Sequence, residues 1–399
     1  MVEGTSFENW HRGNSIGGSN PPASVMRILA IETSCDETAI SLLETSDGKL
    51  FDVLAHEVSS QINVHKEWGG VVPMLAKREH AKNLPEILAR IMNNELGIKV
   101  DLIAVTYGPG LEPALWEGIN FARGLSMKWN VPLVATDHLE GHIVSALLKR
   151  MSNEQFEICK LELPAIALLI SGGHTQLVLM REMGSYEVVG NTRDDAVGEA
   201  FDKVARILGL PYPGGPEISR LASHFETSKY PNIKISLPRP MLHSGDLDYS
   251  FSGLKTAVLY LAKKLKEENK GELTDEQKIA IAHEFEQAVT EVLIKKTTDA
   301  ITKYGAKSLL VGGGVIANKT IRDHLRLTVG PVADSQPREV ALHLPDLKFT
   351  GDNATMIGIA ALLRLGFAGQ AYLHPEFLLH SDTSAFAELK ASGNLSLYK

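Results

Sequence analysis

Short apolar runs alternate with longer amphipathic stretches along the chain after Met26. A short apolar run that ends in small polar residues is typical of a buried strand, whereas apolar residues recurring at spacings of three and four are typical of a helix. The pattern predicts strands near 28–34, 39–43, 53–58, 102–106, 165–171, 176–180, 186–189 and 308–311. It predicts helices near 74–96, 119–128, 200–208, 277–304 and 353–365. Strands interleaved with helices indicate an α/β fold.

The two halves of the chain begin in the same way. Residues 28–34 and 165–171 are both buried runs, and each is followed by two more strand-like runs. Each half then contains a further apolar strand that ends in glycine, before Gly108 in the first half and at Gly312 in the second. This internal repeat indicates a duplicated domain.

The length of 399 residues also favours two domains, because a single core rarely grows so large. The start of the chain is rich in Gly, Ser, Asn and Pro and has no apolar stretch of the kind found in signal peptides, so we expect Met26 to be the initiator. The expected divisions are a disordered N-terminal extension at 1–25, a first domain at 26–155 completed by the C-terminal helix near 353–366, a second domain at 160–350, and a C-terminal tail segment at 367–399.

Composition restricts the class of protein. Hydrophobic residues make up 44% and charged residues 22%, which is average for a globular protein. The apolar runs are far shorter than the roughly 20 residues of a membrane helix, so we expect no membrane span. The two cysteines, Cys35 and Cys159, are too few for a disulfide framework and favour the cytoplasm.

The formal net charge of −8 argues against a general attraction to nucleic-acid phosphates. Any contact with RNA would therefore be local. Basic residues do gather at Lys77, Arg78 and Lys82, and again between Lys255 and Lys266, where helical spacing would form stripes. A solvated helix face is the plainer interpretation of each stripe.

Two histidines and one distant aspartate suggest a metal site. A helix would place His138 and His142 on the same face, as two ligands of one ion require. Asp352, in the turn before the last predicted helix, offers a third ligand. Such a set leaves coordination positions open for a substrate and suits iron or zinc. Packing histidines and a helix N-cap are the plainer alternatives.

Several glycine-rich turns indicate a nucleotide. The turn Ser171-Gly172-Gly173-His174 ends a strand, and glycine lets backbone amides approach a phosphate without interference from a Cβ atom. The triple glycine 312–314 lies between a strand and a helix, a geometry that admits a nucleotide, and Asn318 follows it. Asp202 is a candidate ribose-binding acid, and Gly215 marks a further close approach. Ordinary turns and a solvated carboxylate are the alternatives.

Nine short motifs follow one another between Met26 and about Leu365. They are Glu32-Thr-Ser-Cys-Asp-Glu-Thr38, Tyr107-Gly-Pro-Gly110, Asp137-His-Leu-Glu-Gly-His142, Ser171-Gly-Gly-His-Thr175, Gly198-Glu-Ala-Phe-Asp-Lys203, Tyr212-Pro-Gly-Gly-Pro216, Phe251-Ser-Gly-Leu-Lys-Thr256, Gly312-Gly-Gly-Val-Ile-Ala-Asn318 and Asp352-Asn353. Read together, they closely resemble the motifs of the TsaD family of tRNA-modifying enzymes. The form of the seventh motif resembles the bacterial and organellar branch.

The resemblance implies a fold and a reaction. The duplicated arrangement is similar to the actin, Hsp70 and sugar-kinase (ASKHA) superfamily, whose two domains close on a nucleotide in the cleft between them. The TsaD family transfers a threonylcarbamoyl group from threonylcarbamoyl-AMP to the N6 amine of adenosine at tRNA position 37. Expected partners are tRNA, with TsaB-like and TsaE-like proteins if the chain is bacterial, or a second copy of the chain in a homodimer if it is organellar.

The resemblance also implies residue roles. His138, His142 and Asp352 would bind one divalent metal per chain, with Fe²⁺ favoured over Zn²⁺. Asp36 resembles the catalytic acid–base residue. The adenylate contacts would come from Ile170, Ser171, Gly172, Gly173, His174, Asp202, Gly215 and Asn318.

Three other classes of protein share some of these features. A zinc metallopeptidase of the zincin type has glutamate directly after the first histidine, where this chain has Leu139. A small-molecule kinase of the same superfamily would use the glycine turns but needs no histidine pair with a distant aspartate. A catalytically silent binding module would keep the turns and lose the acid or the metal ligands, all of which are present.

Overall fold

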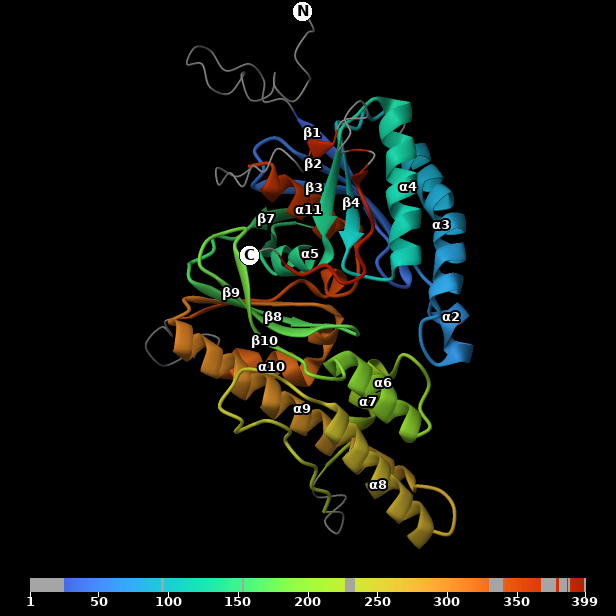
Figure 1. The fold of residues 1–399 in the computed structure, drawn as a ribbon, viewed down its shortest axis with the longest axis vertical. Coiled ribbons are helices and arrows are strands. Elements are labelled where there is room, and N and C mark those ends of the chain that lie inside the picture. The colour runs from blue at the N-terminus through green and yellow to red at the C-terminus, as the bar shows by residue number, and fades with distance from the viewer. Residues whose placement is uncertain are drawn as a thin grey trace, which may run out of the picture.

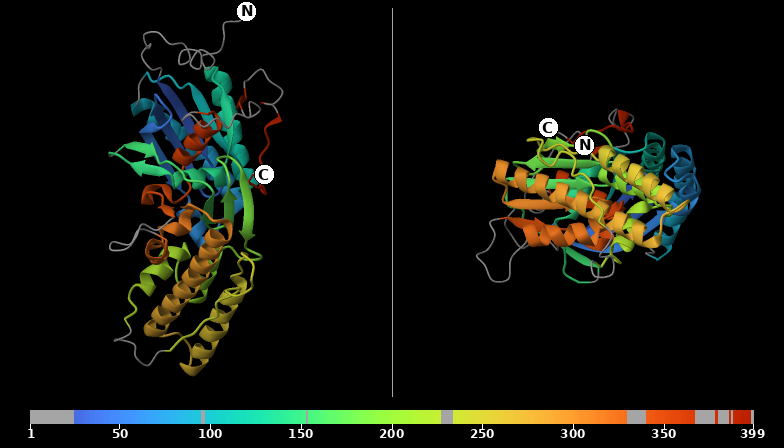
Figure 2. Two further views of the ribbon diagram at one scale, coloured as in Figure 1. Left: turned by 90° about the vertical axis from the view of Figure 1, so that its left-hand side faces the viewer. Right: turned by 90° about the horizontal axis from the view of Figure 1, so that it is seen from below.

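Two β-sheets, each flanked by helices, follow one another along the long axis of the molecule (Figures 1 and 2). The computed structural model describes residues 25–94, 97–152, 154–226, 234–329, 340–366, 378–379, 386 and 388–397. The predicted disordered extension lies outside these residues except for Val25, and so does most of the predicted tail.

The first sheet is built mainly from the first part of the chain. Its order is β13 (Leu378–Leu379), β5 (Leu133–Asp137), β4 (Leu102–Gly108), β1 (Met26–Glu32), β2 (Glu37–Thr45), β3 (Leu50–Ser60), β7 (Gln155–Ile158) and β6 (Leu148–Arg150). Strand β1 is antiparallel to β2 and parallel to β4, and β4 is parallel to β5.

The second sheet repeats the centre of the first. Its order is β10 (Tyr186–Asn191), β9 (Thr175–Met180), β8 (Ala165–Ile170), β11 (Ser308–Gly312) and β12 (Ala341–His343). Strand β8 is antiparallel to β9 and parallel to β11, and β11 is parallel to β12. The five strands therefore have the same order and the same directions as β3, β2, β1, β4 and β5, which confirms the predicted duplication.

Helices cover both sheets. The helices of the first part are α2 (Ile62–His65), α3 (Pro73–Asn94), α4 (Glu112–Trp129) and α5 (His138–Ser145), with the short 3₁₀ turn η1 (Lys66–Trp68) between α2 and α3. Those of the second part are α6 (Val197–Ile207), α7 (Gly214–Ala222), α8 (Ser252–Glu268), α9 (Asp275–Tyr304) and α10 (Lys319–Thr328), followed by α11 (Ala354–Arg364), with 3₁₀ turns η2 (Gly314–Ala317) and η3 (Leu347–Phe349). Among the described residues, no helix is both long and apolar enough to cross a membrane.

Side chains along β1 point alternately to the two faces of the first sheet, and this shows how the site is positioned. Leu29 and Ile31 point into a core shared with α3 and α4, whereas Ile28 and Ala30 point into a core shared with α5 and α11. The second core also contains residues of the other sheet, such as Ala167. Helices α5 and α11 therefore lie between the two sheets, near the centre of Figure 1.

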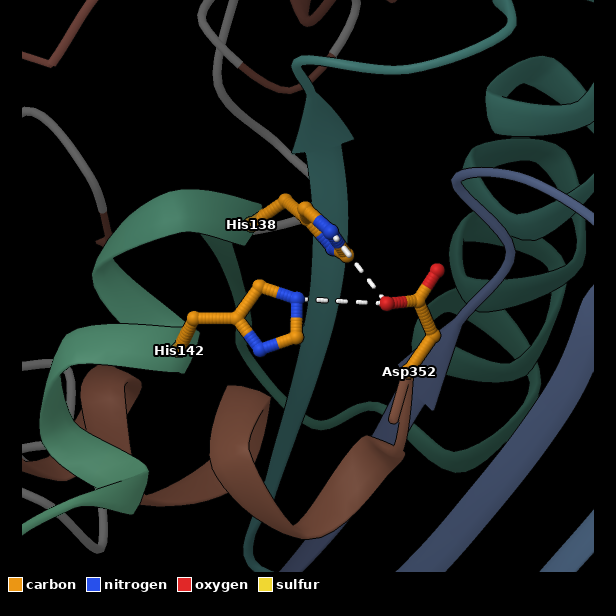
Figure 3. Close-up of side chains that lie close together, drawn as sticks. All are labelled: His138, His142 and Asp352. Atoms are coloured by element: carbon orange, nitrogen blue, oxygen red, sulfur yellow. Dashed lines mark hydrogen bonds and ion pairs between the residues drawn. The ribbon is translucent and has the colours of Figure 1, made fainter. Parts of the chain in front are cut away.

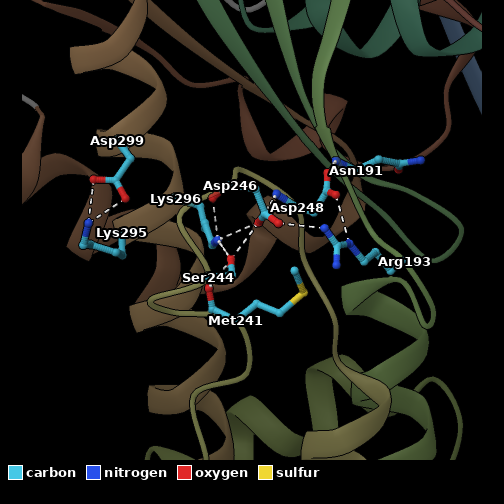
Figure 4. Close-up of polar contacts among 9 residues, drawn as sticks. All are labelled: Asn191, Arg193, Met241, Ser244, Asp246, Asp248, Lys295, Lys296 and Asp299. Carbon is cyan, nitrogen blue, oxygen red and sulfur yellow. Dashed lines mark hydrogen bonds and ion pairs between the residues drawn. The ribbon is translucent and has the colours of Figure 1, made fainter.

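The segment before α8 is held by a buried lysine. Lys296 of α9 is only 1% exposed, and its Nζ atom donates to the Ser244 hydroxyl over 2.8 Å and to the Asp246 carbonyl over 2.6 Å (Figure 4). Arg193 binds Asp248 in the same segment at 3.0 Å. These contacts fix the chain that leads into the motif at the start of α8, because a buried lysine is stable only when its charge is paired.

Candidate metal and nucleotide site

Helix α5 begins at an N-cap and carries both candidate histidines. The Asp137 carboxylate accepts hydrogen bonds from the backbone amides of Leu139 and Glu140, at 2.7 and 3.1 Å. This is the contact that a helix start requires, and it follows directly from the end of β5. The rings of His138 and His142, one turn apart, are 4.6 Å apart between centroids. The predicted shared face is present.

Asp352 completes a three-residue cluster (Figure 3). Its Oδ1 atom lies 3.5 Å from Nε2 of His138 and 3.2 Å from Nε2 of His142. One ligand atom from each residue falls within 4.8 Å of the others. The N-cap alternative for Asp352 is wrong, because Asn353 caps α11 by accepting from the Met356 amide at 3.0 Å. Asp352 is thereby left to face the histidines.

A buried carboxylate orients the first histidine. Glu32, the last residue of β1, accepts from Nδ1 of His138 at 3.1 Å and from the Ser34 amide and the Thr106 hydroxyl at 2.5 Å. This directs the other ring nitrogen of His138 toward Asp352. Proteins commonly use a carboxylate on the far side of a histidine to fix a metal ligand, so the donor set fits a divalent cation.

The charged groups of this cluster shift one another's pKa values. Burial lowers the pKa of His138, but the charges of Asp352 and Glu32 outweigh it and raise that pKa to about 9. Burial lowers the pKa of His142. Burial raises the pKa of Asp352, yet the two histidines hold it well below its usual range. A negative carboxylate that faces two imidazoles offers the charge and the donor atoms that a divalent cation binds.

Asp36 lies in a buried acidic loop directly after β1. It is 7% exposed, and burial, followed by the charge of Asp36, raises the pKa of the Cys35 thiol beside it. Burial, together with the charges of Asp352 and Asp36, raises the pKa of Glu37 to about 10. Burial, with the charges of Asp36 and Asp202, also raises the pKa of Tyr212. The charges of Asp36 and Asp202, which come from the two halves of the molecule, therefore act on the same Tyr212 hydroxyl.

A cavity of about 560 Å³ lies in the second half of the chain. Four of the predicted adenylate residues line it: Gly172, Asp202, Gly215 and Asn318. The other four, Ile170, Ser171, Gly173 and His174, are not among its lining residues in the described chain. The side chain of Ile170 is fully buried in the core, so only its backbone remains for a ligand.

The turn after β8 connects the cavity to the metal cluster. The Ser171 hydroxyl accepts from the His174 amide at 3.1 Å, and the Ser171 amide donates to the His174 carbonyl at 2.9 Å. Burial, and then the charges of His138 and His142, lowers the pKa of His174 to about 4. The turn thus places Gly172 at the cavity and His174 within electrostatic reach of the cluster.

The three glycines at 312–314 have two different roles. A Cβ atom on Gly312 would collide with the His142 carbonyl, and one on Gly313, whose φ is +96°, would collide with the Ile170 carbonyl. Only Gly314 faces open space and lines the cavity. Close packing of the chain on itself therefore explains the first two glycines, and access for a ligand remains the explanation for the third.

Asp202 and Asn318 already bind within the protein. The Asp202 carboxylate accepts from the Gly214 amide at 2.6 Å, at the start of α7. Asn318 caps α10 through its oxygen, which accepts from the Ile321 amide at 3.0 Å. Its amide nitrogen donates to Glu286 at 2.7 Å. Each residue holds in place an element that borders the cavity, and the predicted adenylate contacts remain predictions.

The family model described as "TsaD: tRNA N6-adenosine threonylcarbamoyltransferase" matches residues 52–359. The chain belongs to the TsaD family. A protein of Chromobacterium violaceum named tRNA N6-adenosine threonylcarbamoyltransferase is 45% identical over 350 residues, which is 87% of this chain and 95% of that protein. A protein of the same name from Paraburkholderia xenovorans is 46% identical over 342 residues, 85% of this chain and 92% of that one.

A solved structure supports the fold. Full-length HypF in a phosphate- and nucleotide-bound form has a TM-score of 0.52 and 11% identity, and the match covers 87% of this chain. The chain spans about half of that protein, since 47% of its length is covered. At this identity the likeness concerns the fold alone. With the repeated sheet order, it confirms the duplicated ASKHA-like α/β fold.

Sequence reasoning on this TsaD-family chain missed two supporting carboxylates. The role of Glu32 was not recognised, although its place at the carboxyl end of a buried strand is a signal for a site residue. Glu286, 3% exposed, accepts from Ser219 and Asn318 at 2.7 Å and from Thr320 at 2.8 Å. Its position in the middle of the long helix α9 gives no such signal.

Proposed function

We propose that the chain transfers a threonylcarbamoyl group from threonylcarbamoyl-AMP to the N6 amine of adenosine at position 37 of tRNA. The observation that carries this proposal is the arrangement of three features around one space. A nucleotide-sized cavity is lined by Asp202, which interacts electrostatically with Asp36. The turn that borders the cavity carries His174, which interacts with the cluster of His138, His142 and Asp352.

The residues of the cluster would hold one divalent cation. His138, His142 and Asp352 supply two nitrogens and a carboxylate oxygen, a set that suits Fe²⁺, which we favour, and also Zn²⁺. When bound, the cation would supply Lewis-acid polarisation of a carbonyl oxygen. Glu32 would keep His138 in the orientation and tautomer needed for binding, since it accepts from the opposite ring nitrogen.

Asp36 is proposed as the proton acceptor. The exocyclic amine of adenosine is a poor nucleophile because its lone pair is delocalised into the ring, so attack on the donor requires removal of a proton. A positioned general base typically contributes about 10²- to 10⁴-fold to such a step. Asp36 is buried in a loop held by the Gln61 amide, which donates to the Asp36 carbonyl at 3.0 Å. This loop gives the carboxylate a defined position.

The glycine turns are proposed to hold the AMP part of the donor. Gly172, Gly215 and Gly314 line the cavity and have open space where a Cβ atom would stand. Gly215 is also at the N-terminal end of α7, where backbone amides attract a phosphate. The donor is a mixed anhydride, so AMP is already a good leaving group once it is bound.

Reconstitution tests the proposal. The purified chain is incubated with threonine, bicarbonate, ATP, an adenylate-forming enzyme, unmodified tRNA and its partner proteins, and the tRNA nucleosides are then analysed. Threonylcarbamoyladenosine that depends on the chain supports the proposal, and its absence with a competent adenylate supply refutes it. About one bound iron or zinc per chain is the second expected result.

The assembly and the compartment belong to the same proposal. The relatives named above are bacterial proteins, so we propose TsaB-like and TsaE-like partners, and a homodimer is the alternative outcome of the reconstitution. Both cysteines, Cys35 and Cys159, are free thiols, which suits a reducing compartment such as the cytoplasm.

A further inference from the structure

Trp68 is a large aromatic residue that the fold leaves in solvent. It ends the short turn η1 and is 67% exposed, whereas the other two tryptophans of the described chain, Trp116 and Trp129, are partly buried against the first core. Gly69 follows it in the left-handed region, with φ +66°, and ends the turn. The indole ring of Trp68 is therefore accessible to a ligand.

The loop that carries Trp68 is tied to the loop that carries Asp36. Gln61, at the start of the loop, donates to the Asp36 carbonyl at 3.0 Å and contacts Nε2 of His65 at 3.1 Å. His65 accepts at its other nitrogen from the Val72 amide, at 3.2 Å, on the far side of Trp68. Nε2 of His80 donates to the Cys35 carbonyl at 2.9 Å. Buried bonds therefore fix both ends of the loop relative to the proposed base.

The same loop touches the other half of the molecule. The Gly69 carbonyl accepts a hydrogen bond from the guanidinium of Arg206. Arg206 lies on α6, one helical turn after Asp202, which lines the cavity. In Figure 1, η1 follows α2 at the point where the helices of the two halves approach each other. The loop of Trp68 is therefore bonded both to the loop that carries Asp36 and to the helix that carries Asp202.

We propose that Trp68 stacks on a nucleobase next to the target adenosine of the tRNA. This inference rests on the proposed function. If one adenosine reaches Asp36, its neighbours in the strand must lie against the segments bonded to the Asp36 loop, and the loop of Trp68 is one of these. Sequence-tolerant stacking on aromatic side chains is a common way to hold splayed, single-stranded bases.

The charges around Trp68 favour RNA over a protein partner. Lys66 in the same turn and Arg78 on α3, the next helix, are exposed and make no ion pair with the described residues. Arg206 adds a third cation at Gly69. Glu67 in the same turn is also exposed, so the excess of positive charge comes from Arg78 and Arg206. Exposed Met74 would suit a protein surface, but a tryptophan in a segment with more cations than anions suits the bases and phosphates of an RNA loop better.

The test compares two exposed aromatic residues. Tyr260 on α8 is 68% exposed, nearly the same as Trp68, and belongs to a helix in the lower part of Figure 1 that carries neither the Asp36 loop nor Asp202. Trp68→Ala, Trp68→Phe and Tyr260→Ala are prepared in the full chain with its partner proteins. Binding of a synthetic anticodon stem-loop that contains the target adenosine is measured by fluorescence anisotropy. Transfer to the same RNA and binding of a donor analogue are measured in parallel.

Loss of one stacked base should change only the Kd and the KM for the RNA. We expect Trp68→Ala to raise Kd and KM for the stem-loop by about 5- to 150-fold, and Trp68→Phe to stay within about 3-fold of the parent. Tyr260→Ala should match the parent. All three variants should bind the donor analogue normally. An abasic site next to the target adenosine should weaken binding of the stem-loop to the parent protein. The same abasic site should not weaken binding to Trp68→Ala any further, because the substitution and the abasic site remove the same interaction.

Three results would overturn the inference. These are an RNA affinity of Trp68→Ala within twofold of the parent, an equal loss in Tyr260→Ala, and a loss confined to association with a partner protein. Absence of transfer in the parent protein would refute the proposed function instead. The two failures are therefore distinguishable.

Discussion

Gly215 offers the sharpest test of the cavity. It is the second residue of α7, it lines the cavity, and a Cβ atom at its position would meet nothing within 4 Å. The Cβ atom of a valine can therefore be added there without a clash inside the protein. Because valine is branched at Cβ and restricted at χ1, its methyl groups cannot swing far from the cavity. Gly215→Val should therefore leave the fold intact and reduce the room for a ligand.

The size of the effect follows from the geometry. A ligand that packs against the backbone of Gly215 would have to shift, and forcing extra methyl groups into a packed contact costs about 1–3 kcal/mol. This corresponds to a Kd for the adenylate that is about 5- to 150-fold higher. The free energy of unfolding should change by no more than about 0.5 kcal/mol, as for substitutions that touch no other residue.

A matched control is available in the same fold. Gly253 is the second residue of α8, and a Cβ atom there also meets nothing within 4 Å, but Gly253 does not line the cavity. Calorimetric titration with a non-hydrolysable threonylcarbamoyl-AMP analogue and thermal unfolding are measured for Gly215→Val, Gly253→Val and the parent. If Gly215→Val is folded and binds the analogue as tightly as Gly253→Val, the cavity is not the adenylate site.

The other predictions concern the cluster, the base and the packing glycine. His138→Ala should lose metal, as measured by elemental analysis, and lose transfer while its thermal unfolding stays near that of the parent; normal metal content would refute the ligand assignment. Glu32→Gln should weaken metal binding about 10- to 100-fold in a chelator competition, and unchanged affinity would remove its orienting role. Asp36→Asn should slow single-turnover transfer about 10²-fold or more with donor and metal still bound; a rate within a few-fold of the parent would exclude a general base. Gly313→Ala should reduce the free energy of unfolding by more than about 1 kcal/mol, and an unchanged denaturation midpoint would contradict the packing role.

The cluster of His138, His142 and Asp352 shows how much of a site the local sequence pattern can predict. Spacing alone placed His138 and His142 on one face, because a helix repeats every 3.6 residues. Nothing local connects them to Asp352, which is 210 residues away from His142. That contact depends on α11 packing against α5, where Gly141 lets Met356 approach closely. The place of Asp352 in a turn before a helix made it a candidate ligand, and the family resemblance indicated its pairing with the two histidines.

The spacing of apolar residues did not predict helix α5 or the start of α4, and each case has a physical reason. All eight residues of α5 are buried, so the helix has no polar face to create an amphipathic pattern. Helix α4 begins at Glu112, well before the predicted residue 119, because Pro113 suits the first turn of a helix. Helix α8 was not predicted, although its lysines were noted as a basic stripe. Strands of the two sheet centres were easier, since buried strands are short, continuous apolar runs.

Glycines that look equivalent in the sequence do different things in the fold. Gly312 and Gly313 are required because the chain packs against its own carbonyl groups, whereas Gly172, Gly215 and Gly314 leave open space at the cavity. Two polar side chains that border the cavity, Asp202 and Asn318, are engaged in holding α7 and α10. The open glycine turns offer backbone amides to a ligand, and Arg220 and Lys319 also line the cavity. Backbone amides bind phosphate well and distinguish side groups poorly. We therefore expect the cavity to hold the adenylate part of a donor, and the specificity of transfer to depend on the cluster and on Asp36.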